Sequence, residues 1–328
     1  MTNATTQAVP PMAPEARAIL KAIGQSGEPP METLTAQQAR AVADVRVLSK
    51  SFARREGVQA RDTVATGGPV PVPLRIYRSE ASAGETGLPV LIYYHGGGMV
   101  VGSIETVDPH CRWLCVELGC AVVSVGYRLA PEHKFPAGAE DAVAATQWVQ
   151  EHAASFGADP RRLALVGESA GATLVAVCAL TLRDQGRARP AIQILIYGGM
   201  EATVQGPSWD RLGEGYFLTR PKSQWFIDQY LRTPADAADW RASPVKAKRF
   251  DGLPPALVIT AGLDPLIDGS VQYVQQLRAA GVEARYHCFE NWPHGYFYWA
   301  HTDAAQETMR MCVQAVRASW DQQAAAAR

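Results

Sequence analysis

A serine lies between two glycines in the segment Gly167-Glu168-Ser169-Ala170-Gly171, directly after the apolar run 163–166. A serine hydroxyl is a poor nucleophile, so it has to project from its turn to a place where a general base can reach it. A tight turn from a strand into a helix achieves this, and the two glycines keep side chains from crowding that turn. The pattern predicts that Ser169 is the nucleophile of a serine hydrolase.

A second glycine-rich segment, His95-Gly96-Gly97-Gly98, follows another apolar run, 90–94. Because glycine has no side chain, its backbone N–H can approach a developing oxyanion closely, so the N–H groups of Gly97 and Gly98 are predicted donors. Ala170 is the third, because the first N–H groups of a helix have no intrahelical acceptor. Either segment alone could be an ordinary glycine-rich turn, but together and in this order they favour hydrolase chemistry.

The acid of a catalytic triad should follow the serine and precede the histidine. Asp264 comes just after the predicted strand 256–261 and before Pro265, a residue favoured at the first position of a helix. Its alternative role is that of a helix cap, which one aspartate can combine with catalysis. Asp268, one turn later, and Glu290 are weaker candidates.

The base is expected after the last predicted strand, where only His294 and His301 remain. His294 lies between proline and glycine in a loop, whereas His301 is at the start of the predicted C-terminal helix. We therefore expect His294 to take the proton of Ser169, and Asp264 to hold the imidazole in the required tautomer.

Composition excludes several other classes of function. The 328 residues are 47% hydrophobic and 19% charged, with a net charge of −1, which is typical of a soluble globular protein and gives no reason to expect nucleic acid as a partner. No apolar run approaches the ~20 residues of a membrane span, and the first residues do not form a secretory signal. The six cysteines have no metal-binding spacing. We expect a cytoplasmic protein with reduced thiols, no stable membrane insertion, no metal and no cofactor.

The hydrophobic pattern predicts an α/β fold with a mostly parallel eight-stranded sheet. The expected strands are 72–77, 90–94, 121–127, 163–167, 192–197, 256–261 and 284–289, with a weaker one at 62–65. From residue 90 onward they alternate with expected helices at 106–118, 137–152, 170–183, 266–280 and 302–324. This alternation is typical of parallel strands with helices on both faces, and the earliest strands should form an antiparallel edge.

Two segments interrupt this order. Residues 1–55 contain helical patterns at 14–23 and 35–52, and residues 202–250 form an insertion rich in aromatic residues. Because the insertion follows a core strand at the end where such sheets bind ligands, we predict that both segments form a helical cap. The hydrolase core then comprises residues 56–201 and 251–328.

The chain resembles the bacterial hormone-sensitive-lipase-like esterases, which have the α/β-hydrolase fold. The resemblance is carried by residues 95–102, 127–137, 167–171, 264–266 and 294–295, and the helical N-terminus and insertion match the cap of this family. It implies that Ser169, Asp264 and His294 are the triad, that Gly97, Gly98 and Ala170 form the oxyanion hole, and that His95 shapes its loop.

The resemblance also implies a function. The expected activity is a serine carboxylesterase that acts on small-molecule esters of short to medium acyl chains through an acyl-enzyme. An amidase or a small-molecule deacetylase would use the same triad, and a non-catalytic ligand-binding relative is the remaining alternative, although such relatives lack the histidine. A homodimer through the last strand, 284–289, is a further expectation.

Several finer predictions accompany this assignment. Compared with many relatives, the chain has Glu168 in place of aspartate and Ile267 in place of arginine, and the longer Glu168 side chain should shift its hydrogen bonds to the neighbouring loops. Arg128 is expected to pair with Glu132. The expected lining of the substrate pocket is Met99, Glu168, Tyr197, Phe217, Leu266, Trp292 and Tyr296.

Overall fold

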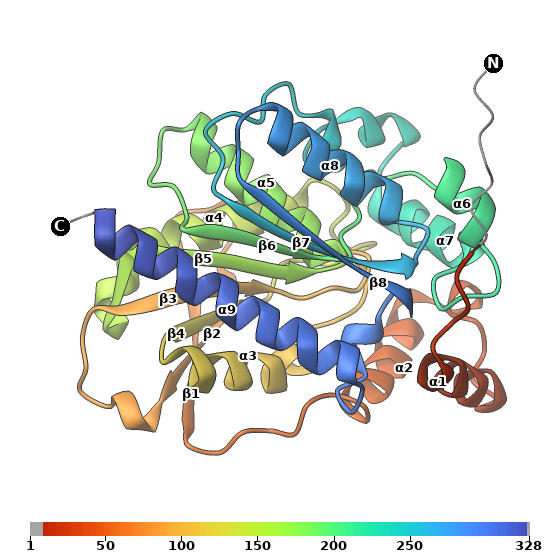
Figure 1. Cartoon of the computed structure of the whole chain (residues 1–328), viewed down its shortest axis with the longest axis horizontal. Helices are drawn as coiled ribbons and strands as arrows, with labels where there is room; N and C mark the ends of the chain where they lie inside the picture. The colour runs from red at the N-terminus through yellow and green to blue at the C-terminus, as the bar shows by residue number, and fades with distance from the viewer. Residues whose placement is uncertain (1–8, 327–328) are drawn as a thin grey trace.

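An eight-stranded sheet forms the centre of the structure, a computed structural model that describes residues 9–326 (Figure 1). Its strands are β1 (Val58–Ala65), β2 (Val72–Ser79), β3 (Leu88–Tyr94), β4 (Ala121–Val125), β5 (Ala158–Glu168), β6 (Ile192–Ile196), β7 (Ala256–Leu263) and β8 (Ala284–Pro293). They lie side by side in the order β1-β2-β4-β3-β5-β6-β7-β8. Strand β2 is antiparallel to both of its neighbours, and every other pair from β4 to β8 is parallel. The predicted fold class and its antiparallel edge are therefore confirmed.

Nine α-helices accompany the strands within residues 9–326: α1 (Pro14–Gln25), α2 (Ala36–Leu48), α3 (Ile104–Leu118), α4 (Ala137–His152), α5 (Ala170–Asp184), α6 (Pro207–Leu212), α7 (Arg220–Tyr230), α8 (Ile267–Ala279) and α9 (Asp303–Ala326). Most boundaries fall within a few residues of the sequence prediction. The larger differences are at β1, β5 and β8, which are longer than predicted. The predicted helix 35–52 ends at Leu48 and begins after a capping box formed by Thr35 and Gln38.

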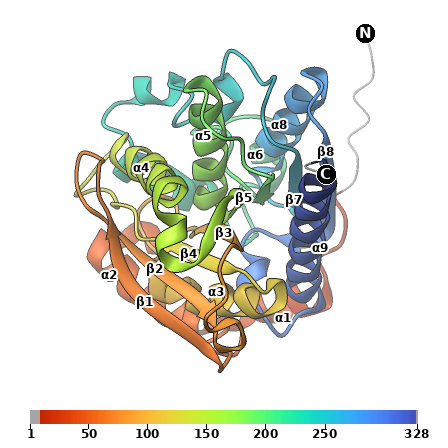
Figure 2. The same cartoon turned by 90° about the vertical axis from the view of Figure 1, so that its left-hand side faces the viewer.

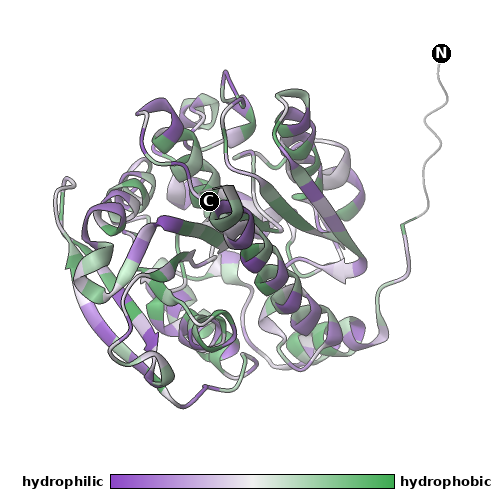
Figure 3. Cartoon of the chain, turned by 60° about the vertical axis from the view of Figure 1, so that its left-hand side comes forward, coloured by the Kyte–Doolittle hydropathy of each residue, from purple (hydrophilic) through white to green (hydrophobic). Residues whose placement is uncertain are grey.

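The sheet separates two apolar layers. Helices α4, α5 and α8 cover one face, and α3 and α9 cover the other (Figures 1 and 2). Because successive side chains of a strand point to opposite faces, Ile92 of β3 packs in the first layer and Tyr93 in the second. Figure 3 shows the resulting apolar strands at the centre of the molecule. Burial on both faces explains why these strands appear in the sequence as continuous apolar runs.

The elements outside this sandwich gather at one end. Helices α1, α2, α6 and α7 all lie near the carboxyl ends of the parallel strands, on the right in Figure 1. No helix within residues 9–326 is both long enough and apolar enough to cross a membrane. Strand β8 is at the edge of the sheet, and its pairing with a second chain stays a prediction.

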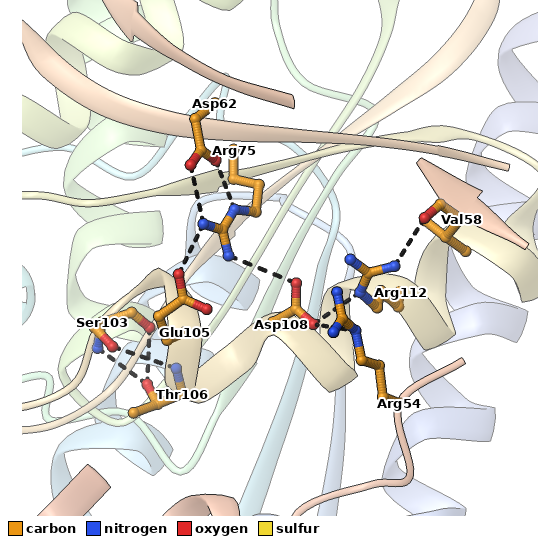
Figure 4. Close-up of polar contacts among 9 residues, drawn as sticks. All are labelled: Arg54, Val58, Asp62, Arg75, Ser103, Glu105, Thr106, Asp108 and Arg112. Atoms are coloured by element: carbon orange, nitrogen blue, oxygen red, sulfur yellow. Dashed lines mark hydrogen bonds and ion pairs between the residues drawn. The ribbon is translucent and has the colours of Figure 1, made fainter. Parts of the chain in front are cut away.

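A cluster of charged side chains holds the antiparallel edge against α3 (Figure 4). Arg75 of β2 pairs with Asp62 of β1 at 2.6 Å and with Glu105 of α3 at 2.7 Å. Arg112 of α3 pairs with Asp108 at 2.8 Å and donates a hydrogen bond to the carbonyl of Val58. These contacts join β1, β2 and α3, and therefore fix the side of the sheet that is farthest from β8.

The predicted pairing of Arg128 with Glu132 is wrong. Arg128 pairs instead with Asp141 of α4, at 2.8 Å, while Glu132 pairs with Arg40 of α2 at 2.6 Å. Arg40 also donates to the carbonyl of Val100 at 2.8 Å. The loop after β4 is therefore held by residues distant in sequence, and Arg40 connects α2 to the segment that follows β3.

Candidate active site

Ser169 occupies a strained turn between β5 and α5. Its backbone angles, φ 53° and ψ −119°, lie in a region that residues other than glycine rarely adopt. A Cβ atom on Gly171 would lie 2.0 Å from the carbonyl oxygen of Tyr94, and one on Gly167 would lie 2.4 Å from the carbonyl oxygen of Gly171. Glycine is therefore required at both positions, and the close packing projects the serine from the end of the sheet.

The three residues predicted as a triad form one hydrogen-bonded chain. The Oγ atom of Ser169 lies 2.9 Å from Nε2 of His294, and Nδ1 of the same ring lies 2.6 Å from Oδ2 of Asp264. Asp264 and His294 are both buried, with 1% and 6% of their surfaces exposed. The Ser169–His294 distance is short enough for proton transfer, and the His294–Asp264 distance is short enough for the aspartate to select the tautomer of the ring.

The carboxylate of Asp264 is further oriented by the backbone of Leu266, whose N–H donates to Oδ1 at 2.9 Å. The weaker candidates lie elsewhere. Asp268 accepts a hydrogen bond from the backbone N–H of Ser208 at 2.8 Å and so fastens the start of α6. Glu290 and His301 are exposed. The structure brings Asp264, and not Asp268 or Glu290, to the histidine.

The glycine-rich loop after β3 faces the same serine. Gly97 has a φ of 112°, and a Cβ atom there would lie 2.1 Å from the carbonyl oxygen of Val101. No described residue accepts a hydrogen bond from the N–H groups of Gly97 and Gly98. Ala170 is the first residue of α5, where a backbone donor has no intrahelical acceptor. These three N–H groups are free to bind an anionic oxygen next to Ser169.

Glu168, the last residue of β5, anchors this loop through a hydrogen bond. Its Oε1 accepts a hydrogen bond from the N–H of Gly96 at 2.6 Å and another from the hydroxyl of Tyr298. Burial raises the pKa of Glu168 to about 7, and the hydrogen bonds offset part of this effect. Beside it, the buried ring of His95 stacks on Tyr127, and burial lowers the pKa of His95 to about 4. A histidine that stays neutral at physiological pH fits a role in shaping the loop.

The serine, the histidine and the glycine loop open into one cavity of about 210 Å³. Its walls are mainly apolar and come from the strand ends, from the N-terminal segment and from the insertion. Three of the seven residues predicted for the pocket, Met99, Phe217 and Leu266, contribute to this lining.

The other four lie outside the lining. Glu168 is turned away under the glycine loop. The ring of Tyr197 packs against the ring of His294 at 4.7 Å between centroids, on the side of the sheet core. Tyr296 is buried, with its hydroxyl 2.8 Å from Oγ1 of Thr308 in α9, and Trp292 packs against it. These rings therefore support the histidine loop from the core and do not line the cavity.

Several lining residues were not predicted from the sequence. Met31, Ala43, Arg46 and Val47 come from the N-terminal segment, and Trp209, Leu218, Lys222, Ser223, Phe226, Ile227, Tyr230 and Ala242 come from the insertion. Phe226 packs closely on Gly98, because a Cβ atom built on Gly98 would lie 2.5 Å from the ring of Phe226. The aromatic content of the insertion was a signal for such contacts, but it does not tell which residues face inward.

Within residues 9–326, no group of three or more histidine, cysteine, aspartate or glutamate side chains is arranged to hold a metal ion. The six cysteines are all unpaired, and five of them are buried.

Comparison with known sequences places this geometry in context. Residues 91–298 match the protein family described as alpha/beta hydrolase fold. Carboxylic ester hydrolase LipN of Mycobacterium tuberculosis is 43% identical over 237 residues, which cover 70% of this chain and 62% of LipN. Carboxylesterase NlhH of the same species is 38% identical over 73% of this chain and 75% of its own length. Ethyl acetate hydrolase of Pseudomonas putida is 40% identical over 64% of this chain and 67% of its own.

Solved structures extend the similarity to nearly the whole chain. LAE6, an alpha/beta hydrolase enzyme from the metagenome of Lake Arreo, superimposes with a TM-score of 0.88 at 36% identity, covering 95% of this chain and 99% of its own. An esterase of Pyrobaculum calidifontis does so with a TM-score of 0.85 at 33% identity over 94% and 99%.

The buried Glu168 generates a testable prediction about pH and stability. Because its folded-state pKa is raised from 4.5 to about 7, the folded state binds the proton more tightly, and the free energy of unfolding falls as pH rises across that interval. Glu168→Gln removes this contribution. Between pH 5 and pH 8, the stability of the variant relative to the wild type should therefore rise by roughly 2–3 kcal/mol, measured by denaturant unfolding.

Glu290→Gln is the matched control, since that carboxyl group is exposed. Its stability relative to the wild type should change little over the same interval. A stability difference between Glu168→Gln and the wild type that does not vary with pH would contradict the prediction.

Proposed function

The chain belongs to the hormone-sensitive-lipase-like esterases of the α/β-hydrolase fold, and we propose that it hydrolyses small carboxylic esters of short to medium acyl chains through an acyl-enzyme. The observation that carries the proposal is the hydrogen-bonded chain from Ser169 through His294 to Asp264, which faces the same cavity as the free N–H groups of the glycine loop.

In the acylation step, Nε2 of His294 takes the proton of Ser169 as Oγ attacks the ester carbonyl carbon. The carbonyl oxygen becomes anionic and accepts hydrogen bonds from the backbone of Gly97, Gly98 and Ala170. The C–O bond to the alcohol then breaks, and the alcohol leaves with the proton from Nε2.

Deacylation repeats these events with water in place of Ser169. His294 removes a proton from the water as its oxygen attacks the acyl carbon, and it returns the proton to Oγ when the acid is released. Asp264 accepts the hydrogen bond from Nδ1 of His294, which keeps the proton on that nitrogen, and stabilises the imidazolium that forms in both steps.

We further propose that residues 1–55 and 202–250 act together as the cap of this site. Both segments contribute apolar side chains to the cavity wall, where they would exclude water from the acyl group. The name of the Pseudomonas putida relative, ethyl acetate hydrolase, supports a preference for short acyl chains.

Replacement of the nucleophile tests the proposal. Ser169→Ala should reduce kcat/KM for p-nitrophenyl acetate and butyrate by roughly 10⁴-fold or more, because the covalent step needs the hydroxyl. Its thermal unfolding should stay close to that of the wild type. Turnover near the wild-type rate would refute the assignment.

The two aspartates can be separated in the same assay. Asp264→Asn should lower kcat by roughly 10⁴-fold, because an amide in this place favours the wrong tautomer of His294. Asp268→Asn should cost less than about tenfold, because its carboxylate bonds the backbone of Ser208 and not the histidine. The opposite order of effects would show that the acid has been misassigned.

The cap proposal predicts an effect of Arg40, which joins α2 to Val100 and Glu132. Arg40→Ala should loosen α2 and raise KM for butyrate and hexanoate esters by roughly three- to tenfold, since a looser apolar wall buries less of the acyl chain. Arg61→Ala, an exposed arginine of β1, is the control. An unchanged chain-length profile in Arg40→Ala would argue against the cap.

A further inference from the structure

The cavity contains a buried cation that the proposed ester hydrolysis does not use. Lys222, in the first turn of α7, is 9% exposed and contributes to the cavity lining. Its Nζ donates one hydrogen bond, a long one of 3.4 Å to the carbonyl of Phe217. Among the described residues, no carboxylate lies within 4.0 Å of it. A buried ammonium without a counter-ion is costly, so its place in a cavity wall requires an explanation.

The other charged side chains of the cavity wall are already paired. Arg46 of α2 forms an ion pair with Glu28, and Glu201 pairs with Lys246 at 3.2 Å. Glu32 is the acidic group that acts on Lys222, from beyond ion-pair distance. Lys222 is therefore the charged side chain of the described cavity wall that has no carboxylate within ion-pair distance, which suits it to bind an anion.

The cation lies close to the place where the ester would react. Nζ of Lys222 lies 4.0 Å from the centroid of the Phe217 ring. The same ring packs against Gly295, where a Cβ atom would lie 2.9 Å from it, and Gly295 follows the histidine of the triad. One aromatic ring therefore separates the ammonium from the loop that carries His294. Lys222 and Ser169 line the same cavity.

We propose that the preferred substrates are esters that carry a second, ionised carboxylate, and that Lys222 is the residue that binds it. This inference rests on the proposed ester hydrolysis and specifies its substrate class. A carboxylate on the substrate would supply the counter-ion that the protein itself does not provide, in a wall that is otherwise mainly apolar, where a charge-assisted hydrogen bond is strong. The carboxylate can belong to the acyl side, as in a half-ester of a dicarboxylic acid, or to the alcohol side, as in an acylated hydroxy acid.

Two pairs of substrates of similar size distinguish these sources. Monoethyl succinate and ethyl levulinate differ by a carboxylate or a methyl ketone on the acyl side, and acetoxyacetate and acetoxyacetone differ in the same way on the alcohol side. Hydrolysis of all four is followed by pH-stat titration. The quantity of interest is the ratio of kcat/KM for the anionic ester to that for its neutral partner.

In Lys222→Met this ratio should fall roughly ten- to hundredfold for one of the two pairs, mainly through KM, because the variant keeps the length of the side chain and loses the charge-assisted bond. Lys222→Arg should keep a larger part of the ratio. Lys248→Met removes one exposed positive charge and is the control for net charge, with an unchanged ratio expected. The thermal unfolding temperature of Lys222→Met should not be lower than that of the wild type, because the substitution removes a buried unpaired charge.

A second readout comes from pH. Burial, together with the charge of Arg46, lowers the pKa of Lys222 to about 8, while Glu32 raises it slightly. The wild-type ratio should therefore fall as pH rises through about 8, whereas the ratio in Lys222→Arg should hold over the same range. Glu201, the acidic residue of the cavity wall, is paired with Lys246 at 3.2 Å.

Ratios for both pairs that are the same in Lys222→Met and in the wild type would overturn the proposal. So would equal losses on the anionic and neutral esters, because they would show that Lys222 only holds the loop at Phe217. Failure of the wild type to hydrolyse any of the four esters or p-nitrophenyl acetate would instead refute the proposed function, so the two failures are distinguishable.

Discussion

The close approach of Gly171 to the carbonyl oxygen of Tyr94 is the contact on which the site depends. At this point the start of α5 touches the end of β3 with no room for a side chain, so the helix can begin only with its first residues pressed against the neighbouring strand. The serine before it is held at a positive φ, and the glycine loop after β3 is brought beside it. The proposed nucleophile and the proposed oxyanion donors are thus set relative to each other by the backbone of two adjacent parallel strands. The strained backbone conformation of Ser169 persists because the sheet on which the turn rests is buried on both faces and packed tightly.

Glu168 extends this coupling to the rest of the site. One carboxylate oxygen bonds Gly96 in the oxyanion loop and Tyr298 in the segment after β8, the segment that also contains His294. The glycine loop proposed to stabilise the oxyanion and the loop that carries His294 therefore share one buried anchor on β5. Such an anchor has an energetic cost, visible in the raised pKa of Glu168, because the carboxylate has lost its hydration. The cost is consistent with a function in placing these loops.

The sequence predicted those parts that the backbone controls. The glycines around Ser169, the apolar runs of the strands and the order of the candidate triad residues all reflect local steric or periodic requirements, and the sheet order and strand directions agree with them. Predictions about side-chain partners were less successful. Arg128 bonds Asp141 of α4 because that helix packs beside the loop, a contact no local pattern encodes. Tyr197 and Tyr296 lie near the histidine in space or in sequence, yet their rings pack in the core, where both are almost fully buried.

The cavity wall illustrates the same division between backbone and side chains. Reaction chemistry depends on strand ends, where small shifts would break hydrogen bonds of 2.6–2.9 Å between the triad residues. The wall depends on α2, α7 and the loops around them, which contact the reacting groups through side chains such as Phe226 on Gly98. In sequence, Lys222 is the one lysine of a helix that is mostly polar, and the packing of α7 against the N-terminal segment makes it a buried charge. A change of residue on α7 can therefore alter which ester fits without disturbing the serine, the histidine or the oxyanion donors, so substrate preference can vary while the reaction stays the same.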